Sequence, residues 1–469
     1  MKRTPAIGSP TFHLTTAATL AALALCAGGA ASAAPTVRVG GQATSEGQQP
    51  PTNAICLAEI GVPCYGPQDI RTAYGLNGLI NSGNKGTGQT IVVIESYGSP
   101  TIATDLHQFD TDFGIPDPPS LKVLAPLGTV PSDMTQPDQQ NWAFETTLDV
   151  EWAHAIAPGA SIVVLTSPVD ETVGVQGFPE FLELEQYALD HHLGNIISQS
   201  WAAAENTLFR NAAGPQGPKV IADFTAFYER AALEGVTILA SAGDGGSQNA
   251  KTYSEALGAA TSFYTFPTVN FPSSSPLVTA VGGTTLNLDA AGNYKSETVW
   301  DDTSNNAGAG GGGVSQLFPI PLYQLLTVSK QARATLGGHR GIPDISYNAD
   351  DFNSAILVYT SFLAPIGGAD SVGYYLIGGT SEGAPQWAGI VADLNQLAHE
   401  PLGFLNPKLY ALGGLGLFKD FGHDITTGSN AYGGVPGYNA TAGWDPASGW
   451  GTPNLILLPL HWSEFKGAQ

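Results

Sequence analysis

One serine lies in a setting that suits a nucleophile. Ser381 falls in Gly378-Gly379-Thr380-Ser381-Glu382-Gly383-Ala384-Pro385, directly before an apolar stretch at 384–399 that is typical of a buried helix. A helix N-terminus favours developing negative charge, and neighbouring glycines allow a substrate backbone to approach closely. An ordinary N-cap serine after a glycine turn would explain the same residues. The segment alone leaves both interpretations open.

Two carboxylates share one face of an expected helix at 138–155. Glu145 and Asp149 are four residues apart, so their side chains can touch, and their charges repel unless one group is protonated. The apolar neighbours Leu148 and Val150 suggest that this helix is largely buried rather than a solvated acidic face. Placing two acids in a buried helix is unfavourable, which favours a functional role.

A third acid, Asp244, follows an apolar run at 236–241 within a glycine-rich turn. The carboxyl ends of parallel strands line the crevice where ligands bind in α/β sheets. A turn-forming aspartate is the alternative explanation, and for Asp244 alone it is the more common one.

These residues need a scaffold, and the hydrophobic pattern predicts one. Short apolar runs without strict alternation, separated by helical stretches, indicate a parallel sheet that is covered on both faces. One domain is expected from about residue 65 to 469. The expected strands are 90–96, 161–166, 195–200, 236–241 and 276–281, and the expected helices are 138–155, 178–191, 222–233 and 384–399.

The N-terminal region predicts export. Residues 1–33 combine a basic start, a brief apolar run and small residues at Ala31-Ser32-Ala33, which together indicate a secretory signal peptide. Residues 34–66 are expected to form a flexible leader. In an oxidising compartment Cys56 and Cys64 would pair as a local disulfide. A secreted, extracellular monomer is expected.

The formal net charge of −23 argues against nucleic acid or an anionic membrane as a partner. After the signal segment, no apolar run is long enough to span a bilayer. An acidic surface suits work at low pH, although solubility or salt adaptation would also account for it.

Taken in order along the chain, these segments resemble the sedolisin family of serine-carboxyl peptidases. The family's Gly-Thr-Ser-x-x-x-Pro motif matches Gly379 to Pro385, its Glu-x-x-x-Asp helix matches Glu145 and Asp149, and its glycine-aspartate turn matches Asp244. The resemblance implies an α/β, subtilisin-like three-layer fold with a central, mainly parallel sheet over residues 67–469. A histidine-based triad is rejected, because no His-Gly-Thr-His motif occurs.

The resemblance also implies roles for these residues. Ser381 would attack the peptide bond, Glu145 would act as its base, and Asp149 would hold Glu145. A protonated Asp244 would donate a hydrogen bond to the oxyanion. A carboxylate is an effective base only in acid, so the expected function is endopeptidase activity on polypeptides at acidic pH.

Two further sets of residues come from the resemblance. Glu95 and Trp201 would extend the carboxylate chain, although Trp201 could equally be a core or cleft-wall aromatic. One structural Ca²⁺ ion would be held by oxygen atoms of Asp424, Ile425, Thr441, Gly443 and Asp445.

The chain departs from the family pattern at two points. The segment before the peptidase domain is too short to build the usual large prodomain. Glu382, beside the nucleophile, would add negative charge near the site. A non-catalytic peptide-binding protein of the same fold and an exopeptidase are the alternative functions.

Overall fold

The computed structural model describes residues 38–44, 47–171, 174–209, 216–254, 259–305 and 308–467. Its central sheet has the strand order β13-β12-β8-β6-β3-β5-β4, with β16 paired to β12. Every pairing in it is parallel except that of β12 with β13. The expected α/β fold with a mainly parallel sheet is confirmed. The strands are β3 (Thr90–Ser96), β4 (Leu121–Leu124), β5 (Ser161–Ser167), β6 (Ile196–Gln199), β8 (Thr237–Ser241), β12 (Thr279–Leu288), β13 (Tyr294–Val299) and β16 (Ile345–Asn348).

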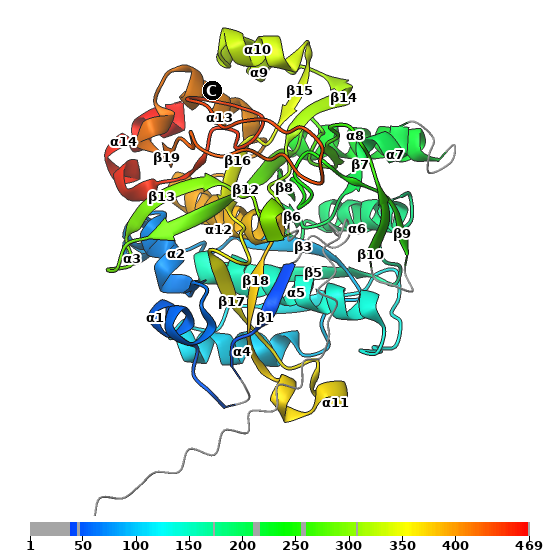
Figure 1. Cartoon of the computed structure of the whole chain (residues 1–469), viewed down its shortest axis with the longest axis vertical. Helices are drawn as coiled ribbons and strands as arrows, with labels where there is room; N and C mark the ends of the chain where they lie inside the picture. Colours follow the sequence, from blue (N-terminus) through cyan, green and yellow to red (C-terminus); the bar gives the residue numbers. More distant parts are fainter. Residues whose placement is uncertain are drawn as a thin grey trace, which may run out of the picture.

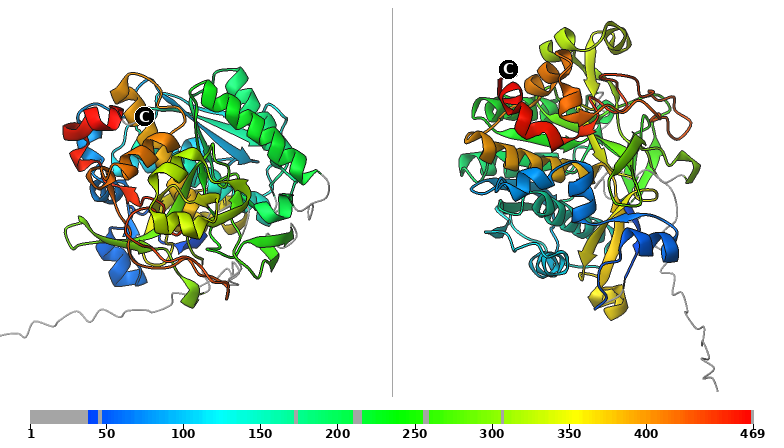
Figure 2. Two further views of the ribbon diagram at one scale, coloured as in Figure 1. Left: turned by 90° about the horizontal axis from the view of Figure 1, so that it is seen from above. Right: turned by 90° about the vertical axis from the view of Figure 1, so that its left-hand side faces the viewer.

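Helices cover both faces of this sheet (Figures 1 and 2). Alternate residues of β3 show the division: Ile91 and Val93 belong to one hydrophobic cluster, and Val92 and Ile94 to the other. The first face packs against α5 (Pro137–Ile156) and α12 (Gly383–Ala398), and the second against α6 (Phe178–Asp190) and α8 (Gly217–Leu233). Burial on both faces explains why these strands are continuously apolar in the sequence.

The predicted boundaries hold to within one or two residues for most of these elements. The exceptions are α8, which begins five residues earlier than expected, and β12, which begins three residues later and ends seven residues later than expected. Pro218 occupies the first turn of α8, where its missing N–H and fixed φ are tolerated.

A second sheet of four strands lies beside the nucleophile segment. Its order is β1 (Arg38–Gln42), β18 (Gly373–Gly378), β17 (Ala355–Thr360) and β2 (Cys64–Tyr65). Figure 1 shows β1 in blue alongside β18 in yellow, and the two strands run antiparallel. The leader, residues 34–66, was expected to be flexible, but in its described part residues Arg38–Gln42 form strand β1. Strand pairing uses backbone groups, so an open strand edge can order a segment poor in apolar side chains.

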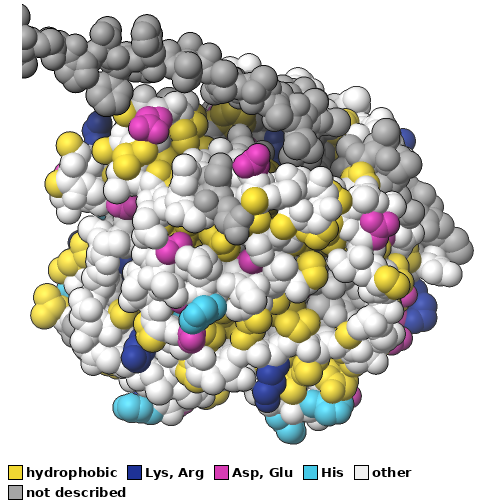
Figure 3. Space-filling model, turned by 90° about the horizontal axis from the view of Figure 1, so that it is seen from below, with side chains coloured by type: hydrophobic (Ala, Val, Ile, Leu, Met, Phe, Trp, Pro, Cys, Tyr) yellow, Lys and Arg dark blue, Asp and Glu magenta, His cyan; other side chains and the backbone are white. Residues whose placement is uncertain are grey.

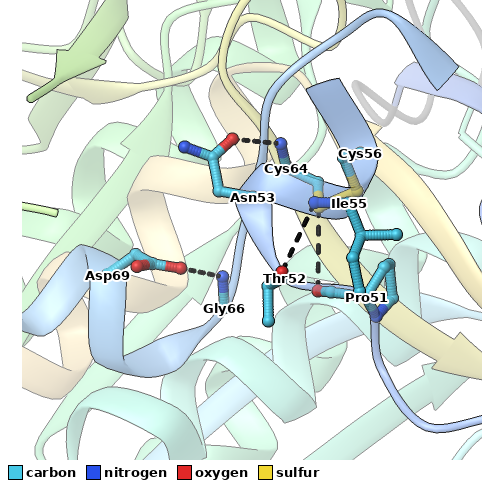
Figure 4. The surroundings of a disulfide bond; sticks show 8 residues. All are labelled: Pro51, Thr52, Asn53, Ile55, Cys56, Cys64, Gly66 and Asp69. Atoms are coloured by element: carbon cyan, nitrogen blue, oxygen red, sulfur yellow. Dashed lines mark hydrogen bonds between the residues drawn. A yellow bond between two sulfur atoms is a disulfide. The ribbon is translucent and has the colours of Figure 1, made fainter. Parts of the chain in front are cut away.

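The predicted disulfide between Cys56 and Cys64 is present (Figure 4). Both cysteines are fully buried, and the backbone N–H of Cys64 donates to the Asn53 side chain over 3.3 Å. The bond joins the turn of α1 (Asn53–Ile55) and η1 (Cys56–Ile60) to β2. It therefore fixes the end of the leader against the second sheet.

The remaining elements surround these two sheets. The helices are α2 (Pro67–Ala73), α3 (Asn77–Asn81), α4 (Ile102–Phe113), α7 (Glu205–Phe209), α9 (Leu322–Thr327), α10 (Lys330–Leu336), α11 (Ala364–Gly367), α13 (Asn406–Gly414) and α14 (Leu458–Gly467). Short 3-10 turns are η3 (Thr303–Asn305), η4 (Ala369–Ser371), η5 (Thr380–Glu382), η6 (Phe418–Asp420) and η7 (Leu455–Leu457). The other strands are β7 (Ala203–Ala204), β9 (Ala250–Ser254), β10 (Ala259–Phe263), β11 (Asn270–Phe271), β14 (Gly313–Pro319), β15 (His339–Ile342), β19 (Gly422–His423) and β20 (Thr452–Pro453).

On the described part of the face in Figure 3, charged side chains are scattered among uncharged groups and form no basic patch. Across the described residues, no helix has both the length and the apolar character needed to cross a membrane. The predicted signal peptide at 1–33 lies outside the described residues.

Candidate active site

Ser381 sits in the turn that joins β18 to α12. The strand ends at Gly378, Gly379 adopts φ +104°, and Ser381 lies in η5, one turn ahead of the long helix. Positive φ there favours glycine, and the backbone N–H of Gly379 donates to the carbonyl of Ala349 over 2.6 Å. This bond and the close packing of Gly378 hold the turn rigidly. The expectation that Ser381 lies near the N-terminus of a buried helix agrees with its position.

Asp244 is tied to the residue next to Ser381. The backbone N–H and the hydroxyl of Thr380 both donate to Asp244 Oδ1 over 2.8 Å, and the same hydroxyl accepts from the Gly243 N–H over 2.9 Å. Asp244 Oδ2 is buried and has no hydrogen-bond partner among the described residues. One carboxyl oxygen is thus fixed in place while the other is left available.

Burial raises the pKa of Asp244 to about 6, while the charge of Arg38 and the bonds from Thr380 oppose the shift. Below that pH the carboxyl carries a proton. Because Thr380 already donates to Oδ1, the proton belongs on Oδ2, where it can be donated to a negatively charged oxygen.

Helix α5, which carries Glu145 and Asp149, lies against the turn that holds Ser381. It also packs against α12. Glu145 and Asp149 are both completely buried, which confirms the expected buried helix. The Ser200 hydroxyl, at the end of β6, donates to Asp149 over 2.8 Å to Oδ2 and 3.0 Å to Oδ1.

Glu95, at the end of β3, completes a cluster of three buried carboxyl groups. Burial, and then the charges of Asp149 and Glu145, raise the pKa of Glu95 well above its usual value. Burial also raises the pKa of Asp149, against the opposing effects of its neighbours Ser200 and Glu95. Because like charges repel in a buried cluster, these carboxyl groups favour keeping a proton among them.

The chain is similar to known proteins over most of its length. Kumamolisin from Bacillus sp. (strain MN-32) is 35% identical over 398 residues, covering 84% of this chain and 63% of its own length. Human tripeptidyl-peptidase 1 is 29% identical over 412 residues, with the same two coverages of 84% and 63%. Pseudomonas sedolisin, a serine-carboxyl proteinase solved in complex with pseudo-iodotyrostatin, superimposes with a TM-score of 0.66 at 26% identity and covers 87% of this chain and 99% of that one. No family model matches the sequence.

The chain belongs to the sedolisin family. It spans somewhat under two thirds of the length of the curated relatives named above, 63% in both cases. The likeness to sedolisin also identifies the two-sheet architecture as subtilisin-like.

Trp201 occupies a different environment from the carboxyl cluster of this sedolisin-family chain. Its ring packs among aromatic side chains, with centroids 5.4 Å from Phe178 and 4.5 Å from Phe181. Its indole N–H has no acceptor among the described residues. These contacts are those of a core aromatic, the alternative weighed above. A role in the carboxylate chain stays a prediction for both residues, and only Glu95 lies in the carboxyl cluster.

Glu382 does not add charge beside Ser381 as the sequence suggested. It is fully buried, its Oε1 accepts from the Asn348 amide over 2.8 Å, and burial raises its pKa well above the usual value. A neutral, hydrogen-bonded Glu382 is a structural side chain of this sedolisin-family turn.

Sequence reasoning missed two partners of the site. Thr380 holds Asp244, and Ser200 holds Asp149. Thr380 could have been found, because it directly precedes the nucleophile in the family motif. For Ser200 the available signal was a hydroxyl side chain at the end of a buried strand, next to Trp201.

The residues expected to hold calcium come together in one loop region. The N–H of Gly443 donates to Asp424 Oδ2 over 2.8 Å, and that of Thr441 to Asp445 Oδ2 over 2.6 Å. Burial raises the pKa of Asp445 to about 6, and none of the ion pairs among the described residues involves either carboxylate. These two carboxylates lie in one loop region without an ion-pair partner among the described residues. Together with backbone carbonyls such as that of Ile425, they offer the oxygen atoms that a hard divalent cation prefers.

Proposed function

We propose that this chain is a secreted serine-carboxyl endopeptidase that hydrolyses peptide bonds at acidic pH. The observation that carries the proposal is the tie between the buried carboxyl group of Asp244 and Thr380, the residue that precedes Ser381. The buried carboxyl cluster of Glu95, Glu145 and Asp149, on elements adjoining the same turn, supports it.

In the proposed reaction Ser381, Glu145, Asp244 and one water molecule account for every bond and proton. The Ser381 hydroxyl oxygen bonds to the substrate carbonyl carbon while its proton passes to Glu145. The carbonyl oxygen becomes negative and receives a hydrogen bond from the protonated Asp244. Breaking the C–N bond returns the proton from Glu145 to the leaving amine and leaves an acyl ester on Ser381. Water, deprotonated by Glu145, then attacks the ester carbon. The bond to the Ser381 oxygen breaks, that oxygen takes the proton back from Glu145, and the acid is released.

Acid conditions suit both the reaction and the fold. Glu145 must be ionised and Asp244 protonated, and a pKa of about 6 for Asp244 sets the upper pH limit. Buried acids outside the site, such as Glu151, Glu185 and Asp393, also have raised pKa values because of burial. Their stabilising contribution is present below their unfolded pKa of about 4 and is lost as the pH rises through the folded values.

Exopeptidase activity is a second candidate, favoured by the similarity to human tripeptidyl-peptidase 1. The two differ in products: an exopeptidase releases short peptides from the ends of chains, and an endopeptidase cuts within them. Peptide binding without cleavage would point to the third, non-catalytic candidate.

The direct test is digestion of a denatured protein by the full chain across pH 3–8, a range that brackets carboxyl and neutral pKa values, with mass spectrometry of the products. We expect internal cleavage in acid, declining above about pH 6 as Asp244 ionises. A blocked N-terminus on the substrate is the matched control, because it stops an aminoterminal exopeptidase and leaves an endopeptidase unaffected. Absence of cleavage at every pH would contradict the proposal.

We also propose that Asp424 and Asp445, with carbonyl oxygens of Ile425, Thr441 and Gly443, hold one Ca²⁺ ion. The ion would supply positive charge between two segments of the same loop region, 424–425 and 441–445, and so stabilise the loop. It has no part in the steps at Ser381.

Removing this ion should lower thermal stability. With a chelator at pH 6 to 7, where the carboxylates compete well with protons, we expect Tm to fall by several degrees, on the order of 1–3 kcal/mol of unfolding free energy. Asp445→Asn should abolish the response to added Ca²⁺, whereas Asp420→Asn, on the neighbouring η6, should keep it. An equal response in both variants would place the ion elsewhere.

A further inference from the structure

Three side chains able to bind a metal lie together near the C-terminus, outside both the proposed active site and the proposed calcium site. Asp420, His461 and Glu464, here called the C-terminal cluster, each offer one donor atom, and these three atoms lie within 4.8 Å of one another. Asp420 belongs to η6, and the other two residues belong to α14. Figure 1 shows α14, in red, beside β19, the strand that comes soon after η6.

Two donors of the C-terminal cluster come from one side of α14. His461 and Glu464 are three residues apart, and side chains at this spacing are neighbours on a helix surface. The helix is kinked at His461, whose backbone angles are φ −110° and ψ 15°. Nδ1 of His461 lies 2.9 Å from Oε2 of Glu464. An imidazole and a carboxylate are therefore already in contact.

The third donor is brought to this pair by the packing of its neighbours. Phe421, which follows Asp420, and Phe465, which follows Glu464, are each 4% exposed, and their ring centroids lie 5.5 Å apart. The His461 ring also packs edge-on against Phe421, with centroids 6.1 Å apart. The two segments of the cluster are thus held together by buried aromatic contacts rather than by the donor side chains themselves.

The spacing of the donors suits a tetrahedral ion. Zn²⁺ binds imidazole nitrogen and carboxylate oxygen at about 2.0–2.2 Å, so its ligand atoms lie about 3.3 Å apart. The His461–Glu464 pair is close to that spacing, and Asp420 needs to move by only about 1 to 1.5 Å. The side chains of His461 and Glu464 are 31% and 46% exposed, which leaves room for this adjustment and for a water molecule as fourth ligand.

No lysine or arginine among the described residues pairs with the C-terminal cluster. Its one ion pair is the internal contact of His461 with Glu464. Lys466, on the same helix, instead pairs with Glu400 over 3.2 Å. A divalent cation would therefore neutralise two carboxylates that have no basic partner in this part of the chain.

We propose that Asp420, His461 and Glu464 bind one divalent transition-metal ion of the zinc type, which fastens α14 to η6. The imidazole decides the class of ion, because Ca²⁺ takes oxygen ligands whereas a mixed set of nitrogen and oxygen donors suits Zn²⁺. Asp420 precedes Asp424 of the proposed calcium site by four residues, so the two sites follow one another along the chain with different chemistry. The inference is independent of the proposed peptidase function.

The test uses the full chain, stripped of metals and then supplied with excess Ca²⁺ so that the calcium site is filled. At about pH 7.5, where an ordinary imidazole is mostly neutral, zinc sulfate is titrated and bound zinc is measured by equilibrium dialysis. We expect one zinc ion per chain. At about a hundredfold excess of free zinc over Kd, Tm should rise by about 2 to 4 °C.

Two isosteric variants at accessible positions should lose the ion while keeping the fold. Asp420→Asn and Glu464→Gln each remove one charged ligand, and we expect each to raise the Kd for zinc at least 10- to 100-fold, on the order of the loss known for weaker perturbations of metal sites. Asp420→Asn should still respond to Ca²⁺, as expected above, so this variant separates the two ions.

His107→Ala is the matched control. Nδ1 of His107 lies 2.8 Å from Oδ1 of Asp117, a contact of the same kind, but no third donor completes a group there among the described residues. Its loss should leave the Kd for zinc unchanged. Equal zinc binding in His107→Ala, Asp420→Asn and Glu464→Gln would overturn the inference.

Amide hydrogen exchange tests whether the ion fastens α14. Zinc should slow exchange in 458–467 of the unaltered chain and not in Glu464→Gln, because local opening of the helix would require release of the ion. Zinc binding without slower exchange in α14 would refute the fastening. None of these readouts uses peptide cleavage, so a failure of the proposed function would leave this inference standing.

Discussion

Replacing Ser381 by Ala should lower kcat/KM on the order of 10⁴- to 10⁶-fold, and Glu145→Gln should do nearly as much. A serine hydroxyl is a weak nucleophile until its proton is taken, and glutamine cannot take it. Because the two groups act in one step, Ser381→Ala/Glu145→Gln should be no less active than the single variants. Steady-state kinetics at pH 4, near the carboxyl pKa, would measure all three.

Glu382→Gln is the control for these substitutions. It lies next to Ser381, is equally buried, and already has a neutral, hydrogen-bonded side chain whose Oε1 accepts from Asn348. Glutamine keeps that acceptor, so we expect activity within about threefold of the unaltered chain, since neutral isosteric changes at satisfied sites are tolerated. If Glu145→Gln were as active as Glu382→Gln, then Glu145 would not be the base.

The second large effect is expected at Asp244. Asp244→Ala removes the donor to the oxyanion, and loss of one such donor lowers kcat by about 10²- to 10³-fold. Asp244→Asn should retain more activity, because the amide oxygen can still accept from Thr380 while the amide N–H replaces the acid proton.

The pH profile distinguishes the role of Asp244 from a purely structural one. Asp244 must be protonated, so activity is present below a pKa of about 6 and is lost as the pH rises through it. Asparagine does not titrate in this range, so Asp244→Asn should lose the limb near pH 6 and stay active at higher pH. Thermal denaturation of both variants would show whether the fold survives. An unmoved limb in Asp244→Asn would assign it to another group.

The two predictions depend on the rigid turn at Gly378 to Ser381. The positive φ of Gly379 and the close packing of Gly378 against 349–351 hold this turn without Glu145. Asp244 does contribute to it, through the two bonds that it accepts from Thr380. Asp244→Asn keeps an acceptor for those bonds, and it is therefore the variant that separates chemistry from movement of Ser381.

Local pattern determined most of the scaffold. The strands and helices that build the central sheet are long, apolar and buried on both faces, so each segment carries its own signal, and the bounds of β3 and α5 follow from it. The motif around Ser381 and the spacing of Glu145 and Asp149 likewise belong to single segments. So does the short disulfide loop of Cys56 and Cys64. Short-range information of this kind is fully present in a sequence.

Only the tertiary structure decided which strands pair when they are distant in the sequence. Nothing in residues 34–66 shows that Arg38 to Gln42 add a strand to β18, because the partner lies more than 300 residues away and strand pairing through backbone groups leaves almost no side-chain signature. The protonation states of Asp244, Glu95 and Glu382 are equally non-local. They follow from burial and from which donors and charges the fold brings near, and a carboxyl group has the same sequence symbol whether it is charged or neutral.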